Sequence, residues 1–293
     1  MMTNTIGNHF SVISICDETF TKENAAGCHL EIEIGYDTLS FAAVDTKRNK
    51  YVFLQSYTLK KVVGFETLIS ELKHLCATKD FLRYSYKSIG VGYITSKFTL
   101  VPAPLFDENK KSIYLNFNHT IVAQEQIVLH DALKNIDSIL LFAIPNKVLA
   151  TLEALFKKAT IKHQSSGLID MLLLQHKNVP EKKVIVHIQA SHFELIVTQG
   201  KKLLFFNSFQ HQSTEDFIYY VLFVYEQLNL NPEQQELLLC GEIEKNSTIY
   251  SILHKYIRTV SFLRRPEQME YSYGFNTIAN HFYYNILSQY LCV

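Results

Sequence analysis

The sequence predicts an α/β protein made of two related lobes, and three observations carry this prediction. Short runs alternate apolar and polar residues, which is typical of half-buried β-strands. Groups of three such runs are each followed by apolar residues at helical spacing, which is typical of an amphipathic helix. This order occurs twice within 293 residues, a length that suits two lobes.

The first lobe is predicted from an alternating hairpin, a third strand and a helix. The predicted elements are strands at residues 30–34, 39–43 and 51–57, a helix over 65–75 and a strand at 88–94. Phe65, Leu68 and Leu72 belong to the apolar stripe of that helix.

The second lobe repeats this order. The predicted elements are strands at residues 184–188, 193–197 and 203–209, a helix capped by Thr214, a strand at 236–240, a helix at 247–257 and a strand at 259–263. The first strands begin 154 positions apart, at Leu30 and Val184, and the third strands end 152 positions apart, at Tyr57 and Phe209. A duplicated lobe accounts for this match, and chance similarity of two antiparallel meanders is the alternative.

The residues between the lobes are predicted to form an inserted unit. Its predicted elements are a helix at 105–117 after Pro102 and Pro104, strands at 126–130 and 138–144, a helix from Pro145 to Lys158, a strand at 160–163 and a helix capped by Ser165 or Ser166 that ends at His176. Phe275, Ile278, Phe282, Ile286 and Tyr290 predict one face of a C-terminal helix. The predicted organisation is an extension at 1–27, a first lobe at 28–94, an inserted subdomain with its return helix at 95–177, and a second lobe at 178–293.

Composition excludes several classes of protein. Apolar residues make up 47% and charged residues 19%, so the chain is able to bury a large core. Lys plus Arg and Asp plus Glu both number 28, which argues against a nucleic acid or a membrane surface as the partner. Five scattered cysteines without CxxC spacing predict reduced thiols. With no basic and apolar leader pattern and no apolar run near the ~20 residues of a membrane span, we expect a cytoplasmic protein.

The order of elements over residues 28–290 resembles the actin-like ATPase superfamily, which has ribonuclease H-like lobes. In that plan mixed sheets are flanked by helices, and a small α/β subdomain is inserted in the first lobe. The segment 144–174, with Ile-Pro-Asn-Lys-Val-Leu at its start and Gly-Leu-Ile-Asp-Met-Leu near its end, is similar to the inserted subdomain and return helix of pilus-assembly and cell-division actin-like proteins. The whole chain also resembles a bacterial family of unknown function with this fold.

This resemblance implies a site for ATP and magnesium at glycine-rich turns, where backbone amides approach the phosphates closely. The candidate residues are Glu33, Gly35, Asp37, Ser191 and Gly241. The first turn keeps a glycine, and Glu33 takes the place of the usual Asp, although Tyr36 brings a large ring. The hairpin at 187–192 keeps neither the acid nor the glycine. The turn that the resemblance assigns to adenosine keeps Gly241 but has Glu242 in place of a second glycine.

These turns predict a degenerate nucleotide site. The chain has only 10 glycines, and the three turns contain no Lys or Arg to meet phosphate charge. The predicted function is a non-catalytic actin-like scaffold or protein-interaction module with no cofactor and a protein partner that is not identified. A divergent nucleotide-binding switch or weak ATPase that holds ATP and magnesium is the alternative. Neither the partner's identity nor the oligomeric state follows from the sequence.

Three other groups of residues each have two interpretations. His187 and His192 flank one turn, with Glu194 nearby, and are either a metal pair or ordinary strand histidines. Arg264 and Arg265 are either a solvated strand end or a contact for phosphate or an acidic partner. The aromatic residues of the C-terminus are either core or an anchor for a partner; they are Tyr271, Tyr273, Phe275, Phe282, Tyr283, Tyr284 and Tyr290.

Overall fold

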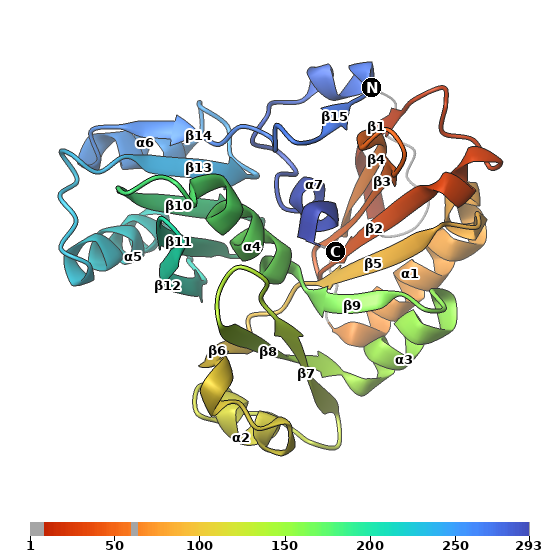
Figure 1. Cartoon of the computed structure of the whole chain (residues 1–293), viewed down its shortest axis with the longest axis horizontal. Helices are drawn as coiled ribbons and strands as arrows, with labels where there is room; N and C mark the ends of the chain where they lie inside the picture. Colours follow the sequence, from red (N-terminus) through yellow and green to blue (C-terminus); the bar gives the residue numbers. More distant parts are fainter. Residues whose placement is uncertain (1–8, 60–63, 293) are drawn as a thin grey trace. The chain divides into compact units, whose positions relative to one another are not determined.

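Three β-sheets and their flanking helices make up the computed structural model, which describes residues 9–59 and 64–292 (Figure 1). The chain divides into two compact units. The first comprises residues 1–168, 266–277 and 286–293, and the second comprises 169–265 and 278–285.

The large sheet of the first unit has the strand order β1-β4-β3-β2-β5-β9, with the short strand β15 beside β4. These strands are β1 (His9–Cys16), β2 (Cys28–Ile34), β3 (Thr38–Asp45), β4 (Lys50–Leu59), β5 (Ser88–Tyr93), β9 (Thr160–His163) and β15 (Glu270–Tyr271). β3 pairs antiparallel with both β2 and β4, and β5 and β9 extend the sheet in parallel. The strands predicted from the sequence are all present. β1 was not predicted, since a bulge between Ser11 and Ile13 interrupts its alternation.

Both faces of this sheet are covered, which explains why successive residues of β2 and β3 are almost all buried. The helices α1 (Phe65–Thr78) and α3 (Asn146–Leu155) lie side by side against one face, and α7 (Ile286–Gln289) lies against β2 and β3 on the other (Figure 1). The Tyr51 hydroxyl donates to the carbonyl of Leu287 at 2.8 Å, which ties α7 to the sheet.

A smaller antiparallel sheet in the same unit has the order β6-β8-β7. Its elements are β6 (Phe98–Pro102), β7 (Gln126–Ala132), β8 (Ser138–Pro145) and α2 (Lys111–Asn116). The predicted helix at 105–117 is wrong in extent, because 3-10 turns at Ala103–Leu105 and Glu108–Lys110 precede the short α2. Asp107 explains the break, since its carboxylate accepts from the amide of Asn109 and starts a new turn there.

The sheet of the second unit has the order β12-β11-β10-β13-β14, the same order as β4-β3-β2-β5-β9. Its elements are β10 (Lys182–Ile188), β11 (Phe193–Gln199), β12 (Lys202–Phe209), β13 (Leu237–Gly241), β14 (Val260–Phe262), α5 (Thr214–Gln227) and α6 (Thr248–Tyr256). Side chains of β10, β11 and β13 pack with those of α5 and α6 in one apolar core that includes Leu195, Phe217 and Leu253. The predicted duplication of lobes is therefore confirmed at the level of strand order.

Three predicted helix starts need correction. Ser213, not Thr214, caps α5, because the acid needed for a reciprocal capping box is Asp216, three residues after Ser213. Pro145 is the cap of α3 and not its first helical residue. Ser165 and Ser166 lie inside α4 (Gln164–His176), because the helix begins at Gln164, before either serine.

The predicted C-terminal helix is also wrong. The chain forms a 3-10 turn at Tyr273–Thr277, then irregular turns, and then the short α7. Tyr283 adopts a left-handed backbone with φ of 57°, which interrupts any continuous helix. Phe275 and Tyr284 are fully buried, whereas the ring of Tyr273 is 86% exposed. Of the seven aromatic residues, two therefore belong to the core, four are half-buried and one is exposed.

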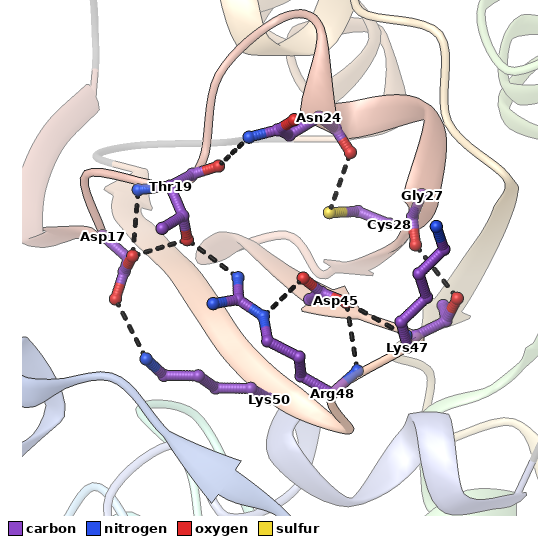
Figure 2. Close-up of polar contacts among 10 residues, drawn as sticks. Asp17, Thr19, Asn24, Gly27, Cys28, Asp45, Lys47, Arg48 and Lys50 are labelled. Atoms are coloured by element: carbon purple, nitrogen blue, oxygen red, sulfur yellow. Dashed lines mark hydrogen bonds and ion pairs between the residues drawn. The ribbon is translucent and has the colours of Figure 1, made fainter.

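A polar network fixes the segment after β1 against the turn between β3 and β4 (Figure 2). Arg48 donates from Nε to Asp45 at 2.7 Å and from Nη2 to the Thr19 hydroxyl at 2.9 Å. The Thr19 hydroxyl donates to Asp17 at 2.6 Å, and this bond holds the pKa of the Asp17 carboxyl below its usual value. Asn49 takes the left-handed conformation that the turn requires.

Within the described residues, none of the helices combines the length and the apolar character that crossing a bilayer demands.

Candidate functional site

The hairpin of β2 and β3 carries three of the five candidate residues, Glu33 on β2 and Gly35 and Asp37 in the turn. The amide of Gly35 donates to the carbonyl of Thr38 at 2.9 Å and closes the turn. A Cβ at Gly35 would lie 3.0 Å from Cδ1 of Ile94, so close packing explains this glycine without a ligand. The ring of Tyr36 is 40% exposed at the tip of the turn.

The carboxylate of Asp37 has an unusual environment. Its Oδ2 is buried and forms no hydrogen bond with any described residue. A buried carboxylate oxygen without a donor is costly, so such atoms are often found where an ion, a water or a ligand binds. Asp37 is therefore the candidate of the first unit that is best placed to meet a cation.

Glu33 lies two positions before Gly35 on β2, in register with Ser40 of β3 and Gly92 of β5. It is half-buried and belongs to the same face of β2 as two further polar residues, His29 and Glu31.

His29 and Glu31 form a buried polar cluster that the sequence interpretation missed. His29 Nε2 lies 3.0 Å from Glu31 Oε2, and its Nδ1 lies 2.8 Å from the hydroxyl of Ser88. Gly90 makes room for the carboxylate, since a Cβ there would lie 2.3 Å from Glu31 Oε2. The signal was present in the sequence, because polar residues occupy every second position of an otherwise apolar strand.

Burial raises the pKa of the Glu31 carboxyl above its usual value, and the hydrogen bond with His29 opposes this shift. Above the unfolded pKa of about 4.3 the folded chain therefore holds more protons than the unfolded chain, and the free energy of unfolding falls as pH rises above that value.

We expect Glu31→Gln to remove this dependence of the free energy of unfolding on pH. Urea unfolding of both proteins from about pH 4 to about pH 8 should show that the free energy of unfolding of the variant increases relative to that of the wild type as pH rises. The exposed Glu125→Gln is the control, and a pH-independent difference for Glu31→Gln would contradict the prediction.

The turn between β10 and β11 carries the fourth candidate, Ser191. The amide of Gln189 donates to the carbonyl of His192 at 3.0 Å, and the Ser191 hydroxyl lies 3.2 Å from His192 Nδ1. His187 pairs instead with Glu194, directly opposite on β11, at 3.0 Å. No group of three metal-ligating side chains occurs in the part of the chain that the structure describes.

Gly241 ends β13, in register with Ile188 of β10. Its φ is 92°, and a Cβ would lie 2.1 Å from the carbonyl oxygen of Ile188. The Gly241 amide donates to His281 O at 2.8 Å, and the Glu242 amide donates to Ile188 O at 2.7 Å. Both amides of the predicted adenosine turn are therefore bonded to main-chain carbonyls of the second unit.

A pocket of about 540 Å³ lies beyond the carboxyl ends of β13 and β14 in the second unit. The His281 ring stacks on Phe262 with centroids 4.0 Å apart, and Phe282 lines the same pocket. Lys245 and Arg264 contribute positive charges and Glu244 a negative one. The carboxyl ends of parallel strands are where ligands of α/β sheets commonly bind. The sequence interpretation missed this pocket, since its parts come from three distant segments.

His281 and the charged side chains beside it determine which groups the pocket offers to a ligand. His281 Nε2 donates to the carbonyl of Ile243 at 2.7 Å, so the neutral ring presents Nδ1 as an acceptor. Burial lowers the pKa of His281, and the nearby charges of Arg265 and Lys245 add to this effect. Arg265 is buried and donates to Ile278 O at 2.7 Å, which makes it structural and leaves the exposed Arg264 as the ligand-accessible arginine.

Comparisons with known proteins place the chain in the class of actin-like folds. The crystal structure of a Bacteroides thetaiotaomicron VPI-5482 protein with an actin-like ATPase fold and unknown function has a TM-score of 0.74 and 26% identity, and the match covers 83% of this chain and 93% of that one. The PilM–PilN type IV pilus biogenesis complex has a TM-score of 0.59 and 15% identity over 90% of this chain and 98% of that one, which shows the fold alone. No curated protein matches the sequence.

The particular family follows from the sequence match. Residues 17–260 match the model of a family described as "Protein of unknown function (DUF3822)", and the chain belongs to that family. The predicted fold class and the resemblance to a family of unknown function with an actin-like fold are thereby confirmed.

Proposed function

We propose that this chain is an actin-like protein-interaction scaffold that does not hydrolyse nucleotide. The observation that carries the proposal is that the main-chain amides of the turn at Gly241 form hydrogen bonds within the fold. The amides of Gly241 and Glu242 donate to His281 and Ile188. A turn that binds a nucleotide through its main chain needs amides that are free to face the ligand, and both of these amides are already bonded within the fold.

The side chains near this turn support the same proposal. Glu242 and Glu244 are exposed beside Gly241 and carry negative charge, and like charge disfavours a bound phosphate. A protein partner is proposed by analogy, because a neighbour of the same fold is described in a complex, PilM with PilN. The identity of the partner and the cytoplasmic location remain predictions.

The test of this proposal is a thermal-shift titration with magnesium and ATP, ADP or GTP. A ligand at about 100-fold its Kd adds about 2.7 kcal/mol to the stability of the folded state, and each kcal/mol raises Tm by about 2–4 °C in a protein of this size. We expect no shift at millimolar nucleotide and no phosphate release. A shift of several degrees would overturn the scaffold proposal.

The alternative is a divergent nucleotide-binding switch or weak ATPase. Two observations favour it: the partnerless Asp37 Oδ2 and the pocket beside Lys245. If nucleotide stabilises the protein, the two places are tested separately. Loss of the shift in Asp37→Asn would assign the ligand to the turn of the first unit, and loss of the shift in Lys245→Ala would assign it to the pocket of the second unit. The exposed Lys255→Ala serves as the control for loss of one positive charge.

A further inference from the structure

An aromatic surface runs along the β12 edge of the sheet in the second unit. It consists of Phe205 and Phe209 on β12 and Tyr219, Tyr220 and Phe223 on α5, and we call it the aromatic edge. Ring centroids lie 6.4 Å apart for Phe205 and Phe209 and 4.9 Å apart for Phe209 and Tyr220. The series continues from Tyr220 to Tyr219 at 5.5 Å and from Tyr219 to Phe223 at 6.2 Å.

Much of the aromatic edge is accessible to solvent. Tyr219 is 62% exposed and Phe223 is 44% exposed, and the other three rings are half-buried. The inner face of α5 is already occupied by Phe217, Val221 and Val224, which are buried in the core. The helix thus carries a second apolar stripe, at i and i+4, that the fold of this unit does not use. Contiguous exposed apolar surface of this kind is typical of interaction sites.

The strand beneath this surface is an edge strand. Among the described strands, β12 pairs with β11 alone and forms one edge of its sheet (Figure 1). Natural edge strands are commonly protected by prolines or charges. β12 contains no proline, and Lys202 at its start is its only charged residue. Its outer side therefore offers main-chain groups that another strand is able to bind.

The charges around β12 point to a second copy of this chain as the occupant. Lys201 and Lys202 are exposed at the beginning of β12, and Glu215 and Asp216 are exposed in the first turn of α5, just after the strand ends. In an antiparallel pair of identical strands, the beginning of each strand lies beside the end of the other. Lys201 and Lys202 of one copy then approach Glu215 and Asp216 of the other, twice by symmetry.

The geometry of the helix supports the same occupant. A two-fold axis perpendicular to the sheet places identical surfaces against each other. The two α5 helices then lie next to each other on the same face of the continuous sheet. Tyr219 and Phe223 of each copy meet their equivalents, and the charged pairs lie at both ends of the interface.

We propose that the chain forms a two-fold dimer by antiparallel pairing of β12 with β12 of a second copy, and that the aromatic edges of the two copies pack against each other. This inference is independent of whether the chain binds nucleotide.

The test is the mass of the full-length chain in solution, measured by sedimentation over a range of concentrations. We expect a dimer for the wild type. The double variant Tyr219→Glu, Phe223→Glu should weaken dimerisation tenfold or more, since it places charges in the centre of the interface. Tyr273→Glu is the matched control, because Tyr273 is 86% exposed and lies outside the aromatic edge.

A second set of variants tests the charge pairs without altering any apolar residue. The double variant Lys201→Glu, Lys202→Glu should also weaken the dimer, and adding Glu215→Lys to it should restore part of the lost affinity. Carbodiimide crosslinking of mixed isotope-labelled copies should join Lys202 to Glu215 between chains. A monomeric wild type, or a dimer that is insensitive to both variant sets while each keeps its Tm, would overturn the proposal.

Discussion

Replacing Gly241 by alanine is expected to lower the free energy of unfolding by about 3 kcal/mol or more, as the sum of backbone strain and overpacking. The new Cβ would lie 2.1 Å from the carbonyl oxygen of Ile188 and 2.9 Å from its amide nitrogen. These are backbone atoms of a paired strand, so relief requires β10 and β13 to separate. The φ of 92° adds strain for any residue with a side chain.

Two other glycines provide the comparison for Gly241→Ala. Gly200 has φ of 55° but an open surrounding, with the nearest atom 3.7 Å away, so alanine there should cost about 1 kcal/mol from backbone strain alone. Gly27 has nothing within 4 Å, and alanine there should be close to neutral. Urea unfolding followed by circular dichroism ranks the three. If Gly241→Ala cost no more than Gly200→Ala, the clash with Ile188 would not be decisive.

The close approach of Ile188 gives Gly241 a structural role that is independent of any ligand. The sequence interpretation assigned the glycine to the approach of a nucleotide. Contact with Ile188 requires glycine at this position in the absence of any ligand. A substitution at Gly241 is therefore a test of the fold, and nucleotide binding is better tested at Asp37 and Lys245.

Replacing Asp131 by alanine is expected to lower the free energy of unfolding by about 3 kcal/mol, because two buried donors lose a charged acceptor. Asp131 lies at the end of β7 and is only 7% exposed. Its Oδ2 accepts from the His163 amide at 2.7 Å and from the Ser166 hydroxyl at 2.6 Å. His163 ends β9 directly before α4, and Ser166 lies in the first turn of α4, where a negative charge also interacts favourably with the helix dipole.

Two further variants separate the contributions at Asp131. Asp131→Asn keeps an acceptor oxygen and loses the charge, so it should cost less than alanine. Asp137→Ala removes an exposed carboxylate from the loop that joins β7 to β8 and should change stability by less than about 0.5 kcal/mol. Chemical unfolding of the three variants provides the measurement. Equal losses for Asp131→Ala and Asp137→Ala would show that the buried hydrogen bonds contribute little.

The proposed dimer and the proposed scaffold role lead to distinct observations. Sedimentation reports on the aromatic edge of the second unit, whereas nucleotide titration reports on the turn at Gly241, the pocket beside Lys245 and the turn at Asp37. Failure of one leaves the other intact. A dimer without nucleotide binding would support a scaffold that acts through fixed surfaces.

The sequence by itself determined most of the strands and helices and the duplication, because these depend on the spacing of apolar residues along a few turns or a few pleats. The two hairpins follow from alternation, and the strands before and after α5 follow from short apolar runs. The resemblance to actin-like proteins followed from the order of these elements. The loss of glycine and acid at the second hairpin was also visible in the sequence, because it concerns residue types at known positions.

Tertiary structure alone decided which distant groups meet. The acceptor at the start of α4 is Asp131, although Ser165 and Ser166 lie locally where a cap was expected. Gly241 is required by a carbonyl on another strand, and Gly90 by the carboxylate of Glu31. The C-terminal segment has helical spacing but breaks at Tyr283, and its α7 accepts a hydrogen bond from Tyr51. Local periodicity does not encode such contacts, since the atoms involved are brought together only when sheets and helices pack.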